Sequence, residues 1–179
     1  GSEMCIRDSL DPTLKYNREK KSEIKLSLFF KEESEYYKNR LQKNSIDFTI
    51  FLEDDFSISI NRGKIVQIID NLISNSEYWL IKLKGNDPNC KPSITIKIES
   101  PWIYFYDNGY GISPAIENML FEPFVTTKPK GEGRGLGLFI IQQLLDSSKC
   151  TIALEPFRNE HGRKYIFAIN FSNIINEYK

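Results

Sequence analysis

The sequence predicts an α+β fold, a two-layer α/β sandwich in which helices cover one face of a mixed sheet. The predicted order is helix, two strands, helix, two strands, loop, helix, two strands, which lacks the regular alternation of a doubly wound nucleotide-binding fold. The spacing of apolar residues distinguishes the helices from the strands. With 179 residues, 40% of them hydrophobic, the chain is long enough for one domain with its own core.

The N-terminal part of the chain divides into two segments. Residues 1–10 have no periodicity and begin with Gly-Ser, a common remnant of tag removal, so we expect a non-native leader. From about residue 12 to 44 the chain is highly charged, and its apolar residues at helical spacing predict an amphipathic helix: Leu26, Phe29 or Phe30, Tyr37 and Leu41. Such a helix either packs on its own domain or forms half of a helical hairpin that dimerises.

The remaining elements follow from periodicity and from turn residues. Alternating apolar residues predict strands at 46–52, 56–60, 94–98, 103–105, 152–154 and 165–171. Helical spacing predicts helices at 62–84 and 136–148. Glycine and proline predict a loop at 85–92, a hairpin turn around Ser100-Pro101 and a largely irregular segment at 107–135.

Charge, hydropathy and cysteine content exclude several classes of protein. Lys and Arg total 24, as do Asp and Glu, so the chain has no overall attraction to nucleic acid or to an anionic membrane. No apolar run reaches the ~18 residues of a membrane span. We therefore expect no nucleic-acid partner and no membrane contact by this chain. Three cysteines without a CxxC motif predict free thiols in a reducing compartment, which indicates a cytoplasmic location.

Two asparagines on the predicted helix 62–84 form the first candidate site. Asn71 and Asn75 are four residues apart and share one helix face, with Gln67 and Tyr78 on nearly the same side. A side-chain amide oxygen is a suitable ligand for Mg²⁺, which also keeps waters and phosphate oxygens. The alternative is a solvated polar face.

Two glycine-containing motifs form the other candidate sites. The segment 107–112, Asp-Asn-Gly-Tyr-Gly-Ile, follows a predicted strand, and its carboxylate could accept a hydrogen bond from a ligand amino group. The segment 131–138 has a glycine at every second position before a helix, where free N–H groups can bind an anion beside Lys128 and Arg134. The alternatives are an ordinary Asn-Gly turn and a flexible linker. A P-loop and a dinucleotide-binding fingerprint are excluded because their spacings fail.

In this order, the motifs resemble the ATP-binding domain shared by DNA gyrase, the ninety-kilodalton heat-shock chaperone, histidine kinases and MutL, the GHKL superfamily. The similarity runs from about residue 48 to 171. It comprises an N box at 71–75, a first glycine box at 107–112, a segment at 121–129 that looks like the F box of histidine kinases, and a second glycine box at 133–138. The resemblance implies a Bergerat-type fold, an ATP-binding catalytic domain at 46–179, and ATP and Mg²⁺ as ligands.

The resemblance also implies roles for individual residues. Asn75 would coordinate Mg²⁺ with help from Asn71, and Asp107 would accept the adenine amino group. Asn71, Asn75 and Lys128 would be the catalytic residues. The adenine pocket and the lid over the triphosphate would be formed by Gly109, Gly111, Ile112, Thr126, Thr127, Lys128, Gly133, Arg134, Gly135, Leu136, Gly137 and Leu138.

Two positions depart from the pattern of histidine kinases. Tyr78, counted here among the nucleotide-binding residues, stands where a basic residue is usual, so a phosphate contact could be missing and Arg134 could replace it. Arg163 stands where the strand motif near the C-terminus usually has Thr, which concerns one end of the adenine pocket.

The residues around Asn71 bear on hydrolysis. In the ATPase branches of the superfamily this position is a glutamate, the general base that activates water, and an amide cannot accept that proton. Glu77 is turned roughly 200° around the helix from Asn75, and Asp70 is turned roughly 100° from Asn71. The resemblance therefore implies phosphotransfer to a histidine elsewhere. His161 lies in a predicted hairpin turn, so the acceptor would lie before residues 11–45, which would be the end of a dimerisation-type helix.

The leading hypothesis is the catalytic domain of a sensor histidine kinase. It would bind Mg-ATP and transfer the γ-phosphoryl to a histidine in a homodimeric parent protein, which would pass it to a response-regulator-like acceptor. One alternative is a GHKL-type ATPase or ATP-driven conformational module without phosphotransfer. The other is a degenerate nucleotide-binding interaction domain.

Overall fold

The computed structural model describes residues 20–176, and its main element is a five-stranded sheet. The strands follow the order β2 (Asp47–Asp54), β4 (Ser93–Glu99), β5 (Trp102–Asp107), β7 (Ile166–Asn170) and β6 (Thr151–Leu154). Strand β2 is parallel to β4, whereas all other neighbours are antiparallel, so the sheet is mixed as predicted.

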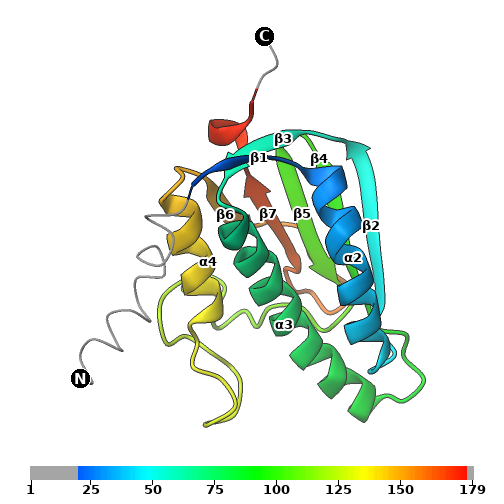
Figure 1. Cartoon of the computed structure of the whole chain (residues 1–179). Coiled ribbons are helices and arrows are strands. Elements are labelled where there is room, and N and C mark those ends of the chain that lie inside the picture. The colour runs from blue at the N-terminus through cyan, green and yellow to red at the C-terminus, as the bar shows by residue number, and fades with distance from the viewer. Residues whose placement is uncertain (1–19, 177–179) are drawn as a thin grey trace, which may run out of the picture.

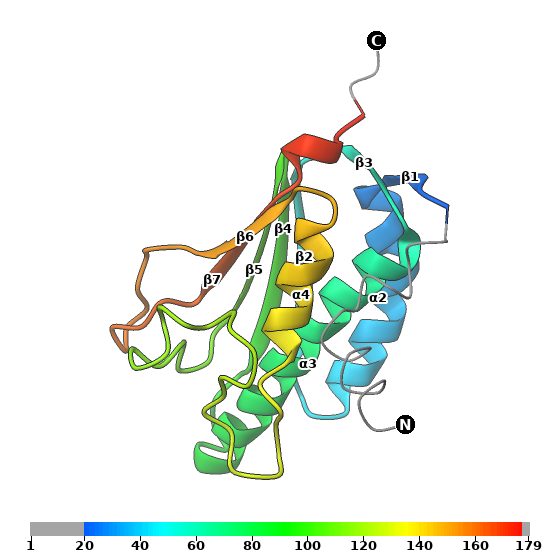
Figure 2. The same ribbon diagram turned by 90° about the vertical axis from the view of Figure 1, so that its left-hand side faces the viewer.

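Three helices cover one face of this sheet (Figure 1): α2 (Leu26–Gln42), α3 (Arg62–Asn86) and α4 (Gly137–Asp146). Figure 2, which turns the sheet towards its edge, shows all three helices on the same side. The predicted two-layer sandwich is therefore confirmed. The segment between β5 and α4 contains neither helix nor strand, as its glycine and proline content predicted.

The long N-terminal helix predicted from residue 12 is wrong over Ser22–Lys25, which form strand β1. This strand pairs antiparallel with β3 (Ser57–Ile60) in a separate two-stranded sheet, where Ile24 lies opposite Ile58. The helix begins only at Leu26, whose N–H donates to the carbonyl of Phe56 at 3.0 Å. Four residues are too few for the apolar spacing to distinguish a strand from a first helical turn. The predicted leader and residues 11–19 lie outside the described residues.

Helix α2 packs on the same core as the strands that follow it. Its apolar stripe is buried and consists of Leu26, Phe29, Phe30, Tyr37 and Leu41. Arg40 joins the helix to α3 through Asp70 and Glu77, each at 3.0 Å. Of the two predicted alternatives, residues 26–42 therefore adopt the one in which the helix packs on its own domain. The assignment of residues 11–45 to the end of a dimerisation-type helix stays a prediction.

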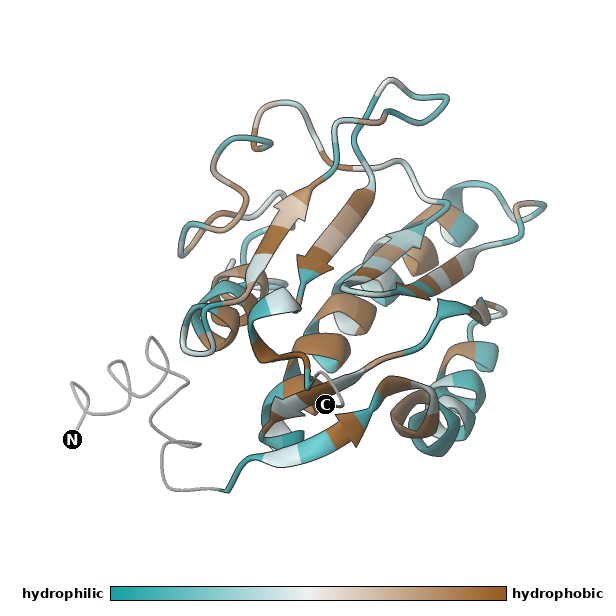
Figure 3. Ribbon diagram, turned by 90° about the horizontal axis from the view of Figure 1, so that it is seen from above, coloured by the Kyte–Doolittle hydropathy of each residue, from teal (hydrophilic) through white to brown (hydrophobic). Residues whose placement is uncertain are grey.

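The core lies between the sheet and the helices. Figure 3 shows hydrophobic residues prevailing on the central strands, whereas the loops at the rim carry both hydrophilic and hydrophobic segments. Within residues 20–176, no helix is long and apolar enough to cross a bilayer.

Strand β5 ends at Asp107, and α4 begins at Gly137. The irregular segment between them therefore connects the sheet layer to the helix layer.

We predict that Leu41→Ala lowers the free energy of unfolding by about 2–5 kcal/mol, because the side chain is fully buried and its removal leaves a cavity. The matched control is Leu28→Ala on the same helix, which should change stability by no more than about 0.5 kcal/mol because Leu28 is 56% exposed. Urea denaturation measures both. Equal, small effects would show that α2 is not part of the core.

Candidate functional site

A cavity of about 330 Å³ brings the predicted motifs together. Its walls come from α3, from the irregular segment between β5 and α4, and from the residues around the start of β7. Every predicted nucleotide-binding residue except Tyr78 lines it: Asn71, Asn75, Asp107, Gly109, Gly111, Ile112, Thr126, Thr127, Lys128, Gly133, Arg134, Gly135, Leu136, Gly137 and Leu138. Segments far apart in the sequence, from Asn71 to Phe167, thus form one site.

The carboxylate of Asp107 lies at the C-terminal end of β5. Alternation along the strand places it on the same face as the core residues Ile103 and Phe105. Ser76 Oγ donates to Asp107 Oδ2 at 2.5 Å, and the Gly109 N–H donates to Oδ1 at 2.8 Å. Burial raises the pKa of Asp107, while these two hydrogen bonds act in the opposite direction. The carboxylate is held in one position, where it can accept a further hydrogen bond from a ligand.

The amides of Asn71 and Asn75 line the cavity from α3. Asn71 Nδ2 is buried and has no hydrogen-bond partner among the described residues, so this residue carries a donor in need of an acceptor. The described part of the chain contains no cluster of three His, Cys, Asp or Glu that could hold a metal ion. Amide oxygens still suit Mg²⁺ when phosphate oxygens and waters complete its coordination. These residues therefore fit Mg²⁺ bound together with a phosphate chain.

The lid segment, residues 124–135, is closed at its base by one backbone contact. The Phe124 N–H donates to the carbonyl of Gly135 at 2.9 Å. Gly135 has φ +68°, and an added Cβ would lie 2.5–2.6 Å from backbone atoms of Phe124 and Val125, so only glycine fits there. The start of α4 follows directly and presents unpaired N–H groups, which favour anions.

Two cationic residues of the lid segment, Lys128 and Arg134, line the cavity. Burial lowers the pKa of Lys128. An anionic ligand would offset the cost of burying this ammonium group, because an opposite charge favours the charged form. The lid segment is therefore suited to a phosphate chain.

Tyr78 lies at the rim of the site and contacts the lid instead of lining the cavity. Its hydroxyl donates to the carboxylate of Glu132, and this hydrogen bond raises the pKa of Tyr78. Lys128 Nζ lies 4.4 Å from the centre of its ring. Lys82, one turn further along α3, lies 3.4 Å from the same carboxylate. The residue at this usually basic position thus connects α3 to the lid segment.

The two carboxylates near Asn71 do not line the cavity. Arg40 of α2 donates to Glu77 at 3.0 and 3.3 Å and to Asp70 at 3.0 Å. A further bond from Arg40 reaches Ser74 Oγ at 2.9 Å. The orientation predicted from helix geometry is therefore confirmed, and an ion-pair network holds both carboxylates away from the site.

Several lining residues were missed by the sequence analysis. Ser76 lies between Leu72 and Leu80 in the buried stripe of α3, and a polar residue in an apolar stripe was the available signal. Other lining residues outside the predicted set are apolar or aromatic, so their residue types alone did not mark them as ligand contacts; they include Trp79, Ile116, Leu120, Val125, Tyr165 and Phe167.

Comparison with known families agrees with this geometry. The family described as "Histidine kinase-, DNA gyrase B-, and HSP90-like ATPase" matches residues 60–173, well over half of the chain. The chain belongs to this family. The resemblance found in the sequence is thereby confirmed, and with it the assignment to the GHKL type of ATP-binding domain.

The curated relatives include bacterial sensor proteins. Sensor protein kinase PilS of Pseudomonas aeruginosa is 28% identical over 139 residues, which are 76% of this chain and 25% of PilS. Sensor protein ChvG of Rhizobium meliloti is 29% identical over 130 residues, 66% of this chain and 21% of ChvG. The chain therefore spans a quarter or less of the length of these relatives.

Solved structures of histidine kinases share the fold. The catalytic domain of histidine kinase ThkA superposes with a TM-score of 0.64 at 25% identity, covering 86% of this chain and 97% of that domain. The mycobacterial sensor histidine kinase MprB gives a TM-score of 0.67 at 15% identity, covering 88% and 99%. The predicted fold class is thus also confirmed by known structures.

We predict that Asp107→Asn stabilises the ligand-free protein relative to wild type, by an amount that grows as the pH rises above about 4. Because the pKa of Asp107 is raised in the folded state, its contribution to stability is present at acid pH and is lost as the pH rises through that pKa. Urea denaturation across a pH series measures the difference. The exposed Asp146→Asn serves as control and should show no such trend. A difference independent of pH would contradict the assignment.

We also predict that Tyr78→Phe increases amide hydrogen exchange in residues 124–135 and leaves the buried turns of α3 unchanged. The variant keeps the ring under Lys128 but removes the hydroxyl that donates to Glu132. Tyr36→Phe, at a ring that is 57% exposed, is the matched control. Exchange in the lid segment equal to that of wild type would mean that Tyr78 does not hold it.

Proposed function

We propose that this chain binds Mg-ATP and transfers the γ-phosphoryl to a histidine that lies outside the chain. The observation that carries the proposal is a single cavity lined by a buried carboxylate, two amides and a glycine-rich segment with two cations. A carboxylate complements the amino group of adenine. Cations and free N–H groups complement a triphosphate.

Each part of the cavity has its own task in this proposal. Asp107 accepts a hydrogen bond from the adenine amino group, beside the turn formed by Gly109 and Gly111. Asn75 supplies an amide oxygen to Mg²⁺, and the unpartnered Asn71 amide donates to a phosphate oxygen. Lys128 and Arg134 stabilise the charge that spreads over the transferred phosphoryl. Mg²⁺ contributes charge neutralisation along the phosphate chain.

The positions of the carboxylates favour phosphotransfer over hydrolysis. Attack by water is fastest when a general base accepts its proton, and an amide at position 71 cannot do so. The nearest carboxylates, Asp70 and Glu77, are bound to Arg40. Asp107 is already hydrogen-bonded by Ser76 and Gly109. An ATPase or an ATP-driven conformational module without phosphotransfer is thus the less supported alternative.

The family and the length of its members support the proposed partners. Relatives such as PilS are several times longer than this chain, so the acceptor histidine is proposed to lie in the parent protein, as part of a cytoplasmic homodimer. A structure of ThkA contains a bound response regulator, and covers 96% of this chain at 22% identity. We propose a response-regulator-like acceptor for the phosphoryl group, and neither nucleic acid nor membrane as a partner of this chain.

Incubation of the full-length parent protein with γ-labelled ATP and Mg²⁺ tests this function. We expect acid-labile, base-stable label on a histidine of the parent and little released phosphate. Released phosphate without labelled protein would instead support the ATPase. A protein that binds no nucleotide would contradict both and leave a degenerate interaction domain.

We predict that Asn75→Ala weakens binding of ATP by at least about tenfold when Mg²⁺ is present, because a metal ligand is lost. In EDTA the variant and wild type should bind ATP alike. The exposed Asn89→Ala is the matched control and should bind as wild type does. Isothermal titration with and without Mg²⁺ measures both. An equal loss in EDTA would mean that Asn75 contacts the nucleotide itself and not the metal.

A further inference from the structure

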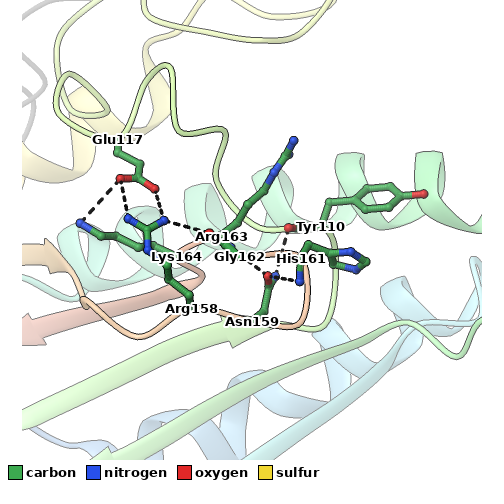
Figure 4. Close-up of polar contacts among 8 residues, drawn as sticks. All are labelled: Tyr110, Glu117, Arg158, Asn159, His161, Gly162, Arg163 and Lys164. Carbon is green, nitrogen blue, oxygen red and sulfur yellow. Dashed lines mark hydrogen bonds and ion pairs between the residues drawn. The ribbon is translucent and has the colours of Figure 1, made fainter.

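The connection between β6 and β7, residues 155–165, lies beside the first glycine box. Arg158 donates to Glu117 at 2.8 and 3.3 Å, and Lys164 lies 3.7 Å from the same carboxylate (Figure 4). The side chain of Glu117 is only 11% exposed, and the hydrogen bond from Arg158 lowers its pKa. This cluster attaches the connection to the segment that follows the first glycine box.

Asn159 attaches the same connection to the glycine box itself. Its Nδ2 donates to the carbonyls of Tyr110 at 3.0 Å and Gly109 at 3.4 Å. Its Oδ1 accepts from the N–H groups of His161 at 2.9 Å and Arg163 at 3.1 Å. One amide therefore fixes the turn of the glycine box and the backbone of Arg163 in a single arrangement.

The backbone of Arg163 packs directly against this turn. Gly111 has φ +88°, and a Cβ added there would lie 2.8 Å from both Arg163 Cβ and Asn159 Nδ2. The Ile112 N–H donates to the carbonyl of Lys164 at 2.8 Å. The two segments are thus in van der Waals contact, with no space for a side chain between them.

The side chain of Arg163 belongs to the cavity. Arg163, Tyr165 and Phe167 follow one another at two-residue steps and all line it. Figure 4 shows the guanidinium extending away from the Glu117 cluster and from Asn159. Among residues 20–176 it makes no hydrogen bond or ion pair. A guanidinium presents five donors in a planar fork, so the cavity holds a strong donor group in need of acceptors.

We propose that Arg163 contacts the adenosine half of the bound nucleotide, donating to acceptor atoms of the purine or the ribose, and that Asn159 is the positioning residue that holds it there. The neighbours of Arg163 argue for this half. It packs on the glycine box that contains Asp107, and the aromatic residues Tyr165 and Phe167 follow it, whereas the cations that suit phosphates lie in the lid segment. This inference rests on the nucleotide binding proposed above.

Titrations of the protein with three probes, each with MgCl₂, test the inference: ATP, adenosine and tripolyphosphate. Arg163→Met keeps the length of the side chain but removes its charge and donors. We expect it to weaken ATP and adenosine by a similar factor, roughly tenfold, and to leave tripolyphosphate unchanged. Arg163→Lys, which restores the charge without the fork, should recover only part of the affinity.

Asn159→Asp tests the positioning role, because it keeps the acceptor for Arg163 but loses the donor to Tyr110 and Gly109. It should weaken adenosine in the same direction, while Glu160→Gln, at an exposed position of the same connection, should bind as wild type does. Since the Arg163 side chain has no partner in the described structure, Arg163→Met should keep the melting temperature of wild type.

Three outcomes would overturn the inference. Unchanged ATP affinity in Arg163→Met would mean that the guanidinium contacts no ligand. A loss confined to ATP and tripolyphosphate would place the contact on the phosphates. If wild-type protein bound neither ATP nor adenosine, the proposed function would fail and this inference with it. If wild-type protein bound both and the Arg163 and Asn159 variants bound them equally well, only this inference would be overturned.

Discussion

The hydrogen bond between Ser76 and the buried carboxylate of Asp107 joins helix α3 to the end of strand β5, and the other parts of the site are arranged around it. Burial of a carboxylate costs free energy unless hydrogen bonds compensate for the lost water, and here two bonds do so only in part, because the pKa stays raised. A core built for stability alone would place an apolar residue at this position. A carboxyl group kept at this cost is the clearest sign in the structure that a ligand completes the site.

Around this carboxylate, the acidic side chains that could activate water lie away from the cavity, and the cationic side chains line it. Carboxylates that could activate water, Asp70 and Glu77, are bound to Arg40 on the outer side of α3. Among the residues that line the cavity, Asn71 has an amide nitrogen without a partner within the described residues, and Lys128 carries positive charge. The same helix thus turns amides towards the ligand and acids away from it. This division is what a phosphoryl-transfer site requires when hydrolysis is to be slow.

Most of the fold and much of the site could be predicted from the sequence, since long periodic elements and glycine spacings are local properties. The strands of the main sheet and helices α3 and α4 were found in this way. The full set of residues at the cavity followed instead from the resemblance of the motifs to the GHKL superfamily. What escaped prediction depends on contacts between distant segments. Strand β1 is defined by its pairing with β3, Tyr78 by its bond to Glu132, and Asn159 by two carbonyls about fifty residues away. No local pattern encodes these partners.

The central claim is that the Asp107 carboxylate accepts a hydrogen bond from the amino group of the bound purine. Its pKa, followed by carboxyl ¹³C NMR in the free protein and with saturating nucleotide, tests this claim most directly. Because a donor stabilises the charged form, ATP should lower the pKa of Asp107, whereas a purine triphosphate with a carbonyl in place of the amino group should not. An unchanged pKa with ATP, or the same decrease with both nucleotides, would contradict the account.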